Sequence, residues 1–211
     1  MNTNYVEFYV SVDIESTGPI PGDYSMSSFG AFIAGARKSD GTFERFDRHD
    51  KANLFYAELK PLNDNFTIEA INVGLLEGFT GEDPTGELHL QWMKDNGKEP
   101  QIVMEAFAAW VNTAKKLLDA RPLFVAFPAS FDWMFIYWYL RHFGVDSPFG
   151  FSGVRDLKEM YATKANVPFS KAAKRFMPKH LLESDVPHTH HALDDAVGQG
   201  YLCLNILEWR P

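Results

Sequence analysis

The sequence has 211 residues, which suits one sizeable α/β domain, and we expect a single domain over residues 1–211. Hydrophobic residues make up 45% of the chain, enough for a buried core, and the net charge of −8 argues against a protein that binds nucleic acid through basic surfaces alone. The single cysteine, Cys203, excludes an intrachain disulfide and a cysteine-built zinc site, and its apolar neighbours favour a buried position. Because neither a signal peptide nor a membrane-spanning stretch is visible, we expect a soluble, cytoplasmic protein.

Three β-strands are predicted in the first third of the chain. Residues 8–14 are rich in β-formers and run into a Gly/Pro loop at 16–22. Residues 29–37 and 53–60 are predicted as the next two strands, with a polar turn at 38–41. Their connections are too short for a crossover helix, so we expect these strands to pair antiparallel.

The remainder of the chain alternates between helices and strands. An amphipathic helix is predicted first, because apolar residues recur at helical spacing from Ile102 to Leu118. The predicted elements after it are a strand at 123–127, a helix at 131–143 closed by Gly144, a strand at 150–156, short helices to about 177 and a last helix at 191–209. This order predicts an α/β fold with a mixed five-stranded sheet flanked by helices.

Acidic residues stand at the ends of two predicted strands. Asp13 and Glu15 are two residues apart, so their carboxylates project from the same face of the first strand. A single Asp-x-Glu triplet is also expected by chance in so acidic a chain. Asp132 falls in the first turn of a helix, where favourable helix-end electrostatics is an alternative explanation. However, it is the only charge in the apolar stretch 122–140, and a lone acid there needs a partner or a metal.

The last helix adds a histidine and an acid. His190 lies just before this helix and Asp195 lies one turn into it, whereas Asp194 is turned by about 100° and should face solvent. His188 and His190 also have the strand-like spacing of a zinc site, but matching ligands at sensible positions are missing.

These residues fit two-metal phosphodiester chemistry. Carboxylate oxygens of Asp13, Glu15, Asp132 and Asp195 are hard ligands that suit Mg²⁺ or Mn²⁺. Two such ions, about 4 Å apart, can clamp a scissile phosphate. His190 is the side chain best suited to remove a proton from the attacking water near neutral pH.

The ordered motifs resemble those of the DEDD, or DnaQ-like, 3′–5′ exonucleases, in the histidine-containing DEDDh variant. The first motif is present as Asp-Ile-Glu-Ser-Thr-Gly at 13–18, the second as Ala-Ser-Phe-Asp at 129–132, and the third as His-His-Ala-Leu-Asp-Asp at 190–195. Val-Arg-Asp-Leu at 154–157 is similar to the family's fifth strand and the helix after it. Each motif is common alone, but the ordered set spans nearly the whole chain.

The resemblance implies a ribonuclease H-like fold, two divalent metals and the release of 5′-nucleoside monophosphates from 3′ ends. It also implies that Ser16, Thr17, Gly18 and Ser130 contact the terminal nucleotide. One departure concerns the second motif, where Pro128 stands in place of the usual Asn and cannot supply its side-chain hydrogen bond. By analogy with apparent relatives, a homodimer is also possible.

Basic residues gather in one segment of this acidic chain. Residues 155–179 contain seven Lys or Arg against two acidic residues, a local balance of +5. We expect Lys171, Lys174 and Arg175 to guide a single-stranded DNA or RNA substrate to the metals, although the solvated faces of two helices would give the same pattern. The alternative function is a catalytically silent nucleic-acid-binding or assembly module with the same fold.

Overall fold

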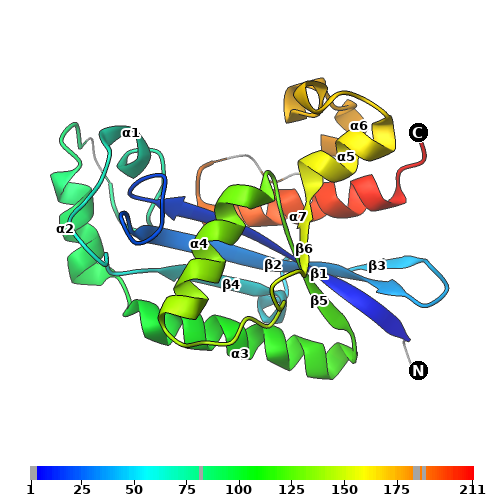
Figure 1. Ribbon diagram of the computed structural model, residues 1–211, viewed down its shortest axis with the longest axis horizontal. Helices are drawn as coiled ribbons and strands as arrows, with labels where there is room; N and C mark the ends of the chain where they lie inside the picture. The colour runs from blue at the N-terminus through cyan, green and yellow to red at the C-terminus, as the bar shows by residue number, and fades with distance from the viewer. Residues whose placement is uncertain (1–3, 81–82, 183–185, 187–188) are drawn as a thin grey trace.

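The computed structural model describes residues 4–80, 83–182, 186 and 189–211, and in this part of the chain six strands form one mixed sheet (Figure 1). The antiparallel half is built on β2, which pairs with β1 as the short connection predicted. β2 also pairs antiparallel with β3 and β4. The bounds of these strands are Tyr5–Ser16 for β1, Met26–Lys38 for β2, Phe43–Arg45 for β3 and Leu54–Glu58 for β4.

The parallel half of the sheet is built on the other edge of β1. There β1 pairs parallel with β5 (Arg121–Ala126), which in turn pairs parallel with β6 (Val154–Asp156). The strand order is β3-β2-β1-β5-β6. β3 pairs with residues 35–37 of β2, and β4 pairs with residues 28–32 of the same strand. The mixed sheet flanked by helices is confirmed. The predicted count of five strands was one short, because the three residues of β3, Phe-Glu-Arg, carry too little pattern to be recognised.

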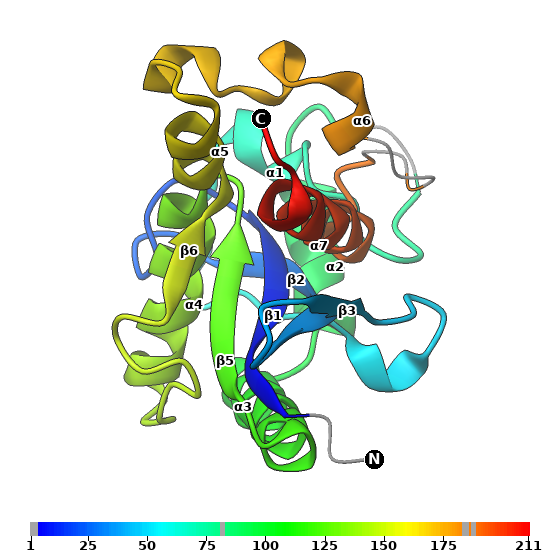
Figure 2. The same ribbon diagram turned by 90° about the vertical axis from the view of Figure 1, so that its right-hand side faces the viewer.

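Helices cover both faces of the sheet. Helices α3 (Pro100–Leu118) and α4 (Ala129–His142) lie on one face, and α7 (Ala192–Glu208) lies on the other (Figure 2). The shorter helices are α1 (Ile68–Ile71), α2 (Glu87–Asn96), α5 (Leu157–Ala165) and α6 (Lys179–Leu182), with 3₁₀ turns at Lys51–Asn53, Phe169–Lys171 and Lys174–Phe176. Helices α1 and α2 were not predicted from the sequence. No helix in these described ranges has both the length and the apolar character needed to cross a membrane.

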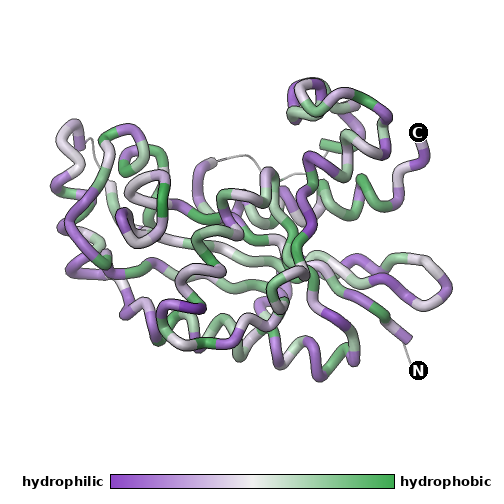
Figure 3. Tube along the Cα trace, in the orientation of Figure 1, coloured by the Kyte–Doolittle hydropathy of each residue, from purple (hydrophilic) through white to green (hydrophobic). Residues whose placement is uncertain are grey.

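Alternation along β1 divides the core into two layers. Val10 and Val12 belong to the layer that contains Phe107 of α3, whereas Tyr9 belongs to the layer that contains Cys203 of α7. The hydrophobic tube segments of both layers run through the centre of the molecule (Figure 3). Successive side chains of a strand point to opposite faces, so the odd-numbered residues of β1 from Glu7 onward face α7, whereas Tyr5, before a register shift, packs in the other layer. Cys203 is buried, as predicted.

A glycine on β2 allows α7 to begin directly against the sheet. A Cβ at Gly30 would lie 2.3 Å from Cα of Leu193, a distance that no side chain tolerates. Gly30 is also the residue of β2 that pairs with Asp13 of β1. The first turn of α7 is therefore seated beside the acidic end of β1.

Candidate active site

Four carboxylates from three elements meet at one end of the sheet. β1 carries Asp13 and Glu15, the first turn of α4 carries Asp132, and the first turn of α7 carries Asp195. Asp132 and Asp195 are each only 5% exposed. The Asp132 carboxylate accepts a hydrogen bond of 3.0 Å from the backbone N–H of Ile14, which joins the start of α4 to β1.

Mutual burial and repulsion perturb these acids strongly. Burial, and then the neighbouring Asp132, Glu15 and Asp195, raise the pKa of Asp13 well above its ordinary value. Burial together with Asp195 and Asp132 raises the pKa of Glu15 to about 8. Burial raises the pKa of Asp132 to about 7, although the hydrogen bond from Ile14 opposes this rise. A cluster of this kind is stabilised by a bound cation, because the cation compensates charges that water does not reach.

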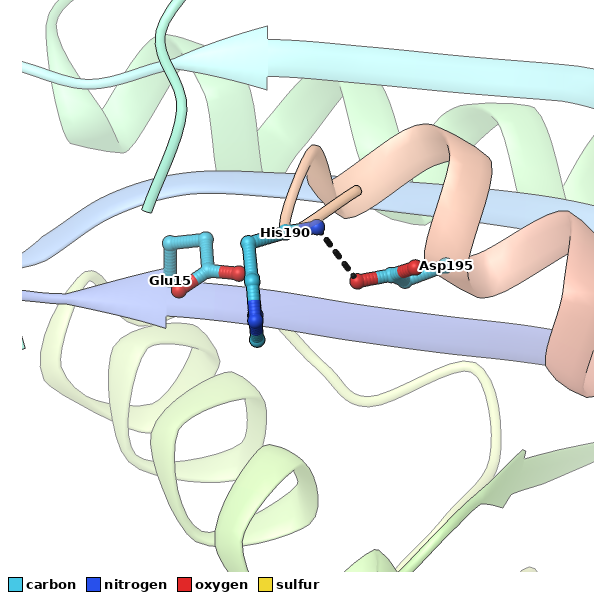
Figure 4. Close-up of side chains that lie close together, drawn as sticks. All are labelled: Glu15, His190 and Asp195. Carbon is cyan, nitrogen blue, oxygen red and sulfur yellow. Dashed lines mark hydrogen bonds between the residues drawn. The ribbon is translucent and has the colours of Figure 1, made fainter. Parts of the chain in front are cut away.

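His190 lies beside the acids on the segment that leads into α7. Its side chain stands between Glu15 and Asp195, and ligand atoms of these three residues lie within 4.8 Å of one another (Figure 4). The backbone N–H of His190 donates to Asp195 Oδ2 over 3.1 Å, and its carbonyl accepts a hydrogen bond of 2.9 Å from the N–H of Leu75. These two bonds hold His190 in the left-handed region, with φ of 58°, and leave its side chain exposed.

The neighbours of His190 support the same segment. The ring of His191 stacks on Tyr56 with centroids 4.6 Å apart, and its Nε2 lies 3.7 Å from the Glu77 carboxylate. Asp194 is half-buried, so it is less exposed than expected, and its carboxylate accepts a hydrogen bond from the Thr189 hydroxyl. His188 lies outside the described residues, so the alternative pair of His188 and His190 is not placed.

A second segment closes the site against β1. Gly74 lies so close to Glu15 that a Cβ at this glycine would be 2.7 Å from the Glu15 Cβ. The adjacent Leu75 is the residue whose N–H holds the His190 carbonyl. The segment at 74–75 therefore touches both an acid of β1 and the histidine segment, which the sequence did not predict.

The residues expected to contact the terminal nucleotide lie at the end of β1, in the loop after it and at the start of α4. The Ser16 hydroxyl donates to the carbonyl of Gly18, and a Cβ at Gly18 would meet the ring of Tyr24. The Thr17 hydroxyl is buried, donates to the Asn65 carbonyl and accepts from the Ser25 N–H. These bonds shape the loop from within. Ser130 is exposed in the first turn of α4.

The basic segment reaches the acids through Lys174. The positive charge of Lys174 is near enough to lower the pKa of both Asp13 and Asp132, against the larger effect of burial. The ammonium group also lies 5.4 Å from the ring centroid of Phe127, the residue that follows β5. Lys171 and Arg175 are exposed farther along, where their cationic groups lie 4.7 and 4.8 Å from the ring centroid of Phe176.

The turn that carries Pro128 is held by two side chains that the sequence analysis did not single out for this purpose. Gln199 of α7 accepts a hydrogen bond from the N–H of Phe127 over 2.7 Å. Asp156 of β6 accepts one from the N–H of Ala129 over 2.8 Å. Only the i, i+4 spacing of Gln199 after Asp195 could have indicated that both point the same way from α7.

The donor set suits a hard divalent cation. Asp13, Glu15, Asp132 and Asp195 offer carboxylate oxygens, which Mg²⁺ and Mn²⁺ prefer, and His190 stands at the exposed side of the cluster. Among the described residues, this cluster at Glu15, His190 and Asp195 is the group of ligand atoms near enough together to hold a metal.

Comparison with known proteins finds a relative in sequence. The chain is 33% identical over 196 residues to the 3′–5′ DNA exonuclease Cap18 of Escherichia coli, covering 93% of this chain and 89% of that protein. No family model matches the chain.

Several solved structures share the fold at lower identity. The nuclease domain of 3′hExo, a DEDDh family member bound to rAMP, aligns with a TM-score of 0.67 at 16% identity, covering 97% of this chain and 93% of that one. Pop2p of S. pombe, in its Mg²⁺- and Mn²⁺-bound form, aligns with a TM-score of 0.59 at 14% identity, covering 94% and 82%. Exonuclease I of E. coli, in complex with a dA16 oligonucleotide, aligns with a TM-score of 0.58 at 15% identity, covering 95% of this chain but only 40% of that one.

Proposed function

Because the chain belongs to the DEDDh family of 3′–5′ exonucleases, we propose that it removes 5′-nucleoside monophosphates one at a time from the 3′ ends of single-stranded DNA. The observation that carries this proposal is the convergence of Asp13, Glu15, Asp132 and Asp195 beside His190. DNA is the proposed substrate because the relative at 33% identity is named as a DNA exonuclease.

In this proposal the four acids hold two divalent ions, Mg²⁺ or Mn²⁺. Bound ions of this kind supply positive charge for the scissile phosphate and ease the deprotonation of water. The Mg²⁺- and Mn²⁺-bound form of Pop2p, which shares the fold, supports the choice of ions. The strongly raised pKa of Asp13 and the pKa of about 8 at Glu15 support a site that ionises fully only when cations are present.

His190 is the proposed general base. Its exposed side chain beside Glu15 and Asp195 suits the transfer of a proton from an attacking water to an imidazole nitrogen. The backbone hydrogen bonds of His190 with Asp195 and Leu75 support this role, because they fix the segment beside the acids. Ser16, Thr17, Gly18 and Ser130 would form the edge of the pocket for the terminal nucleotide.

We propose that the single-stranded DNA substrate runs along the basic segment. Lys174 stands next to the acids, and Lys171 and Arg175 extend the positive charge outward along exposed surface. A DNA strand that enters between the metals and these residues would keep its phosphates near positive charge, although the whole chain has a net charge of −8. We propose single-stranded ends as the substrate, because a 3′ end must reach acids that are largely buried.

The test is cleavage of a 5′-labelled single-stranded DNA in the presence of Mn²⁺. We expect a ladder that shortens from the 3′ end, release of mononucleotides, and no cleavage when EDTA is added. A circular single strand serves as the control, because an exonuclease leaves it intact. Matched RNA and duplex DNA report substrate preference. Absence of cleavage of any linear strand would favour the catalytically silent module instead.

A further inference from the structure

A glutamine outside the recognised motifs is buried next to the acids. Gln199 lies on α7 one turn after Asp195 and is only 2% exposed. A buried amide has a donor and an acceptor to satisfy, and leaving either without a partner is costly. The partners of Gln199 therefore indicate why an amide occupies this position.

Both ends of the Gln199 side chain are engaged. Its Oε1 accepts the hydrogen bond from the backbone N–H of Phe127 over 2.7 Å, and its Nε2 donates to Oδ1 of Asp13. The first bond determines the second. A backbone N–H needs an acceptor, so the amide oxygen must face Phe127 and the NH₂ group must face Asp13.

This arrangement gives Asp13 a fixed hydrogen-bond donor among three other acids. Repulsion from Asp132, Glu15 and Asp195 favours rotation of the Asp13 carboxylate away from the cluster when no cation is present. A hydrogen bond to Oδ1 opposes that rotation. Gln199 is itself fixed by the end of β5, so the plane of the Asp13 carboxylate is tied to both the sheet and α7.

We propose that Gln199 is a positioning residue, which orients Asp13 for metal binding through the hydrogen bond from its Nε2 to Oδ1 of Asp13. This inference rests on the proposed function, because it requires Asp13 to bind a divalent ion. Loss of a partner that orients a metal-binding carboxylate commonly reduces metal affinity or activity by about 10- to 100-fold. We expect the Gln199 variants to show that loss in metal affinity, with turnover at saturating metal changed much less.

The main test measures Mn²⁺ binding without nucleic acid by calorimetry. Gln199→Met keeps the length of the side chain but removes both hydrogen bonds, and we expect its dissociation constant for Mn²⁺ to rise by about 10- to 100-fold. The matched control is Asn205→Leu. Asn205 is another amide on α7 that bridges two elements, since it donates to the Leu181 carbonyl and accepts from Arg45, but away from the acids. Asn205→Leu should bind Mn²⁺ like the native protein.

Kinetics provides the second readout. The concentration of Mn²⁺ needed for half-maximal cleavage should rise in Gln199→Met in parallel with the dissociation constant, while kcat at saturating Mn²⁺ stays within a few fold. A general loss of stability would affect both Gln199→Met and Asn205→Leu. It would also lower kcat at saturating Mn²⁺ and not only raise the Mn²⁺ concentration needed for half-maximal cleavage. Equal metal affinity in native protein and Gln199→Met would overturn the inference.

A measurement on the native protein covers the case in which Gln199→Met does not fold. The side-chain NH₂ resonances of Gln199 should shift when Mg²⁺ is added, whereas those of Asn205 should stay unchanged. Gln199 resonances that ignore Mg²⁺ would contradict the inference. Failure of the proposed function looks different: native protein would bind no Mn²⁺, or Asp13→Asn would bind it as tightly as native protein.

Discussion

At the scale of single residues, the four clustered acids affect folding as well as the proposed catalysis. The folded-state pKa is about 8 for Glu15 and about 7 for Asp132, above the ordinary values of 4.5 and 3.8 that hold in an unfolded chain. The unfolded chain therefore loses these protons first as the pH rises. Without metal, the stability of the folded state is greatest at acidic pH and declines between about pH 4 and about pH 8.

We predict that Asp13→Asn and Asp195→Asn abolish cleavage and weaken this pH dependence. Each change removes one charge from the cluster, so repulsion among the remaining acids decreases. In EDTA, both variants should have a higher melting temperature than native protein at about pH 8, and a smaller difference at about pH 5. The measurement is thermal unfolding at a series of pH values, together with the cleavage assay. Full activity in either variant at saturating Mg²⁺ would remove that residue from the site.

The histidine prediction separates proton transfer from metal binding. We expect His190→Ala to keep its Mn²⁺ and substrate affinity but lose about 10²- to 10⁴-fold in rate, since this is the usual contribution of a general base. The acid limb of the native pH–rate profile should be absent from the residual activity. Single-turnover rates across pH provide the measurement.

His191→Ala is the control for that prediction. His191 packs on Tyr56 and lies beside Glu77, so its loss should loosen the segment and reduce the rate much less than loss of His190. The opposite order, with His191→Ala severely impaired and His190→Ala nearly normal, would mean that the third motif begins one residue later than assigned.

At the scale of elements, the basic segment at residues 155–179 is where the proposed guidance of the DNA strand can be tested. Lys171 and Arg175 are exposed, whereas Lys174 acts on Asp13 and Asp132 and should stay unchanged. Each contact with a single-strand phosphate contributes about 0.7 to the slope of log affinity against log salt concentration. We predict that Lys171→Glu with Arg175→Glu weakens DNA binding and flattens this slope by about 1.4. Turnover of a saturating dinucleotide should change little.

Lys115→Glu with Lys116→Glu is the matched control, because it changes the net charge by the same amount. These two exposed lysines lie in the last turn of α3, just before the start of β5, whereas the acids gather near the other end of that strand. Equal effects of the two pairs would mean that overall charge matters and that the segment has no special path. If the slope of log affinity against log salt concentration is unchanged in the Lys171→Glu, Arg175→Glu variant, these two residues are ordinary surface charges that do not contact the substrate.

At the scale of the whole molecule, the sequence predicted the main elements of the fold but not the contacts between distant segments. Long strands such as β1 and β2 carry strong β-forming patterns, and α3 carries a clear apolar stripe. β3 has three residues and α1 has four, and elements so short depend on their partners for stability. Their existence is therefore decided by tertiary packing.

The same limit applies to the candidate site. The spacing of Asp13 with Glu15 and of His190 with Asp195 is local, so the sequence indicates these pairs directly. The contact of Gly74 with Glu15 and the bond from Gln199 to Asp13 join segments far apart in sequence. A single sequence read by itself carries no sign of such pairs, because an ordinary glycine or glutamine fits many positions equally well.

The order of these parts along the chain also has a consequence for biosynthesis. Asp13 and Glu15 belong to the first strand, whereas His190, Asp195 and Gln199 belong to the last helix and the segment before it. A ribosome therefore completes the sheet strands long before it makes half of the candidate site. A nascent or prematurely terminated chain that stops before residue 189 would lack both the proposed general base, His190, and one proposed metal ligand, Asp195. Such a fragment would be unable to digest nucleic acid in the cell that makes it, and the nuclease would become active only as its final helix docks.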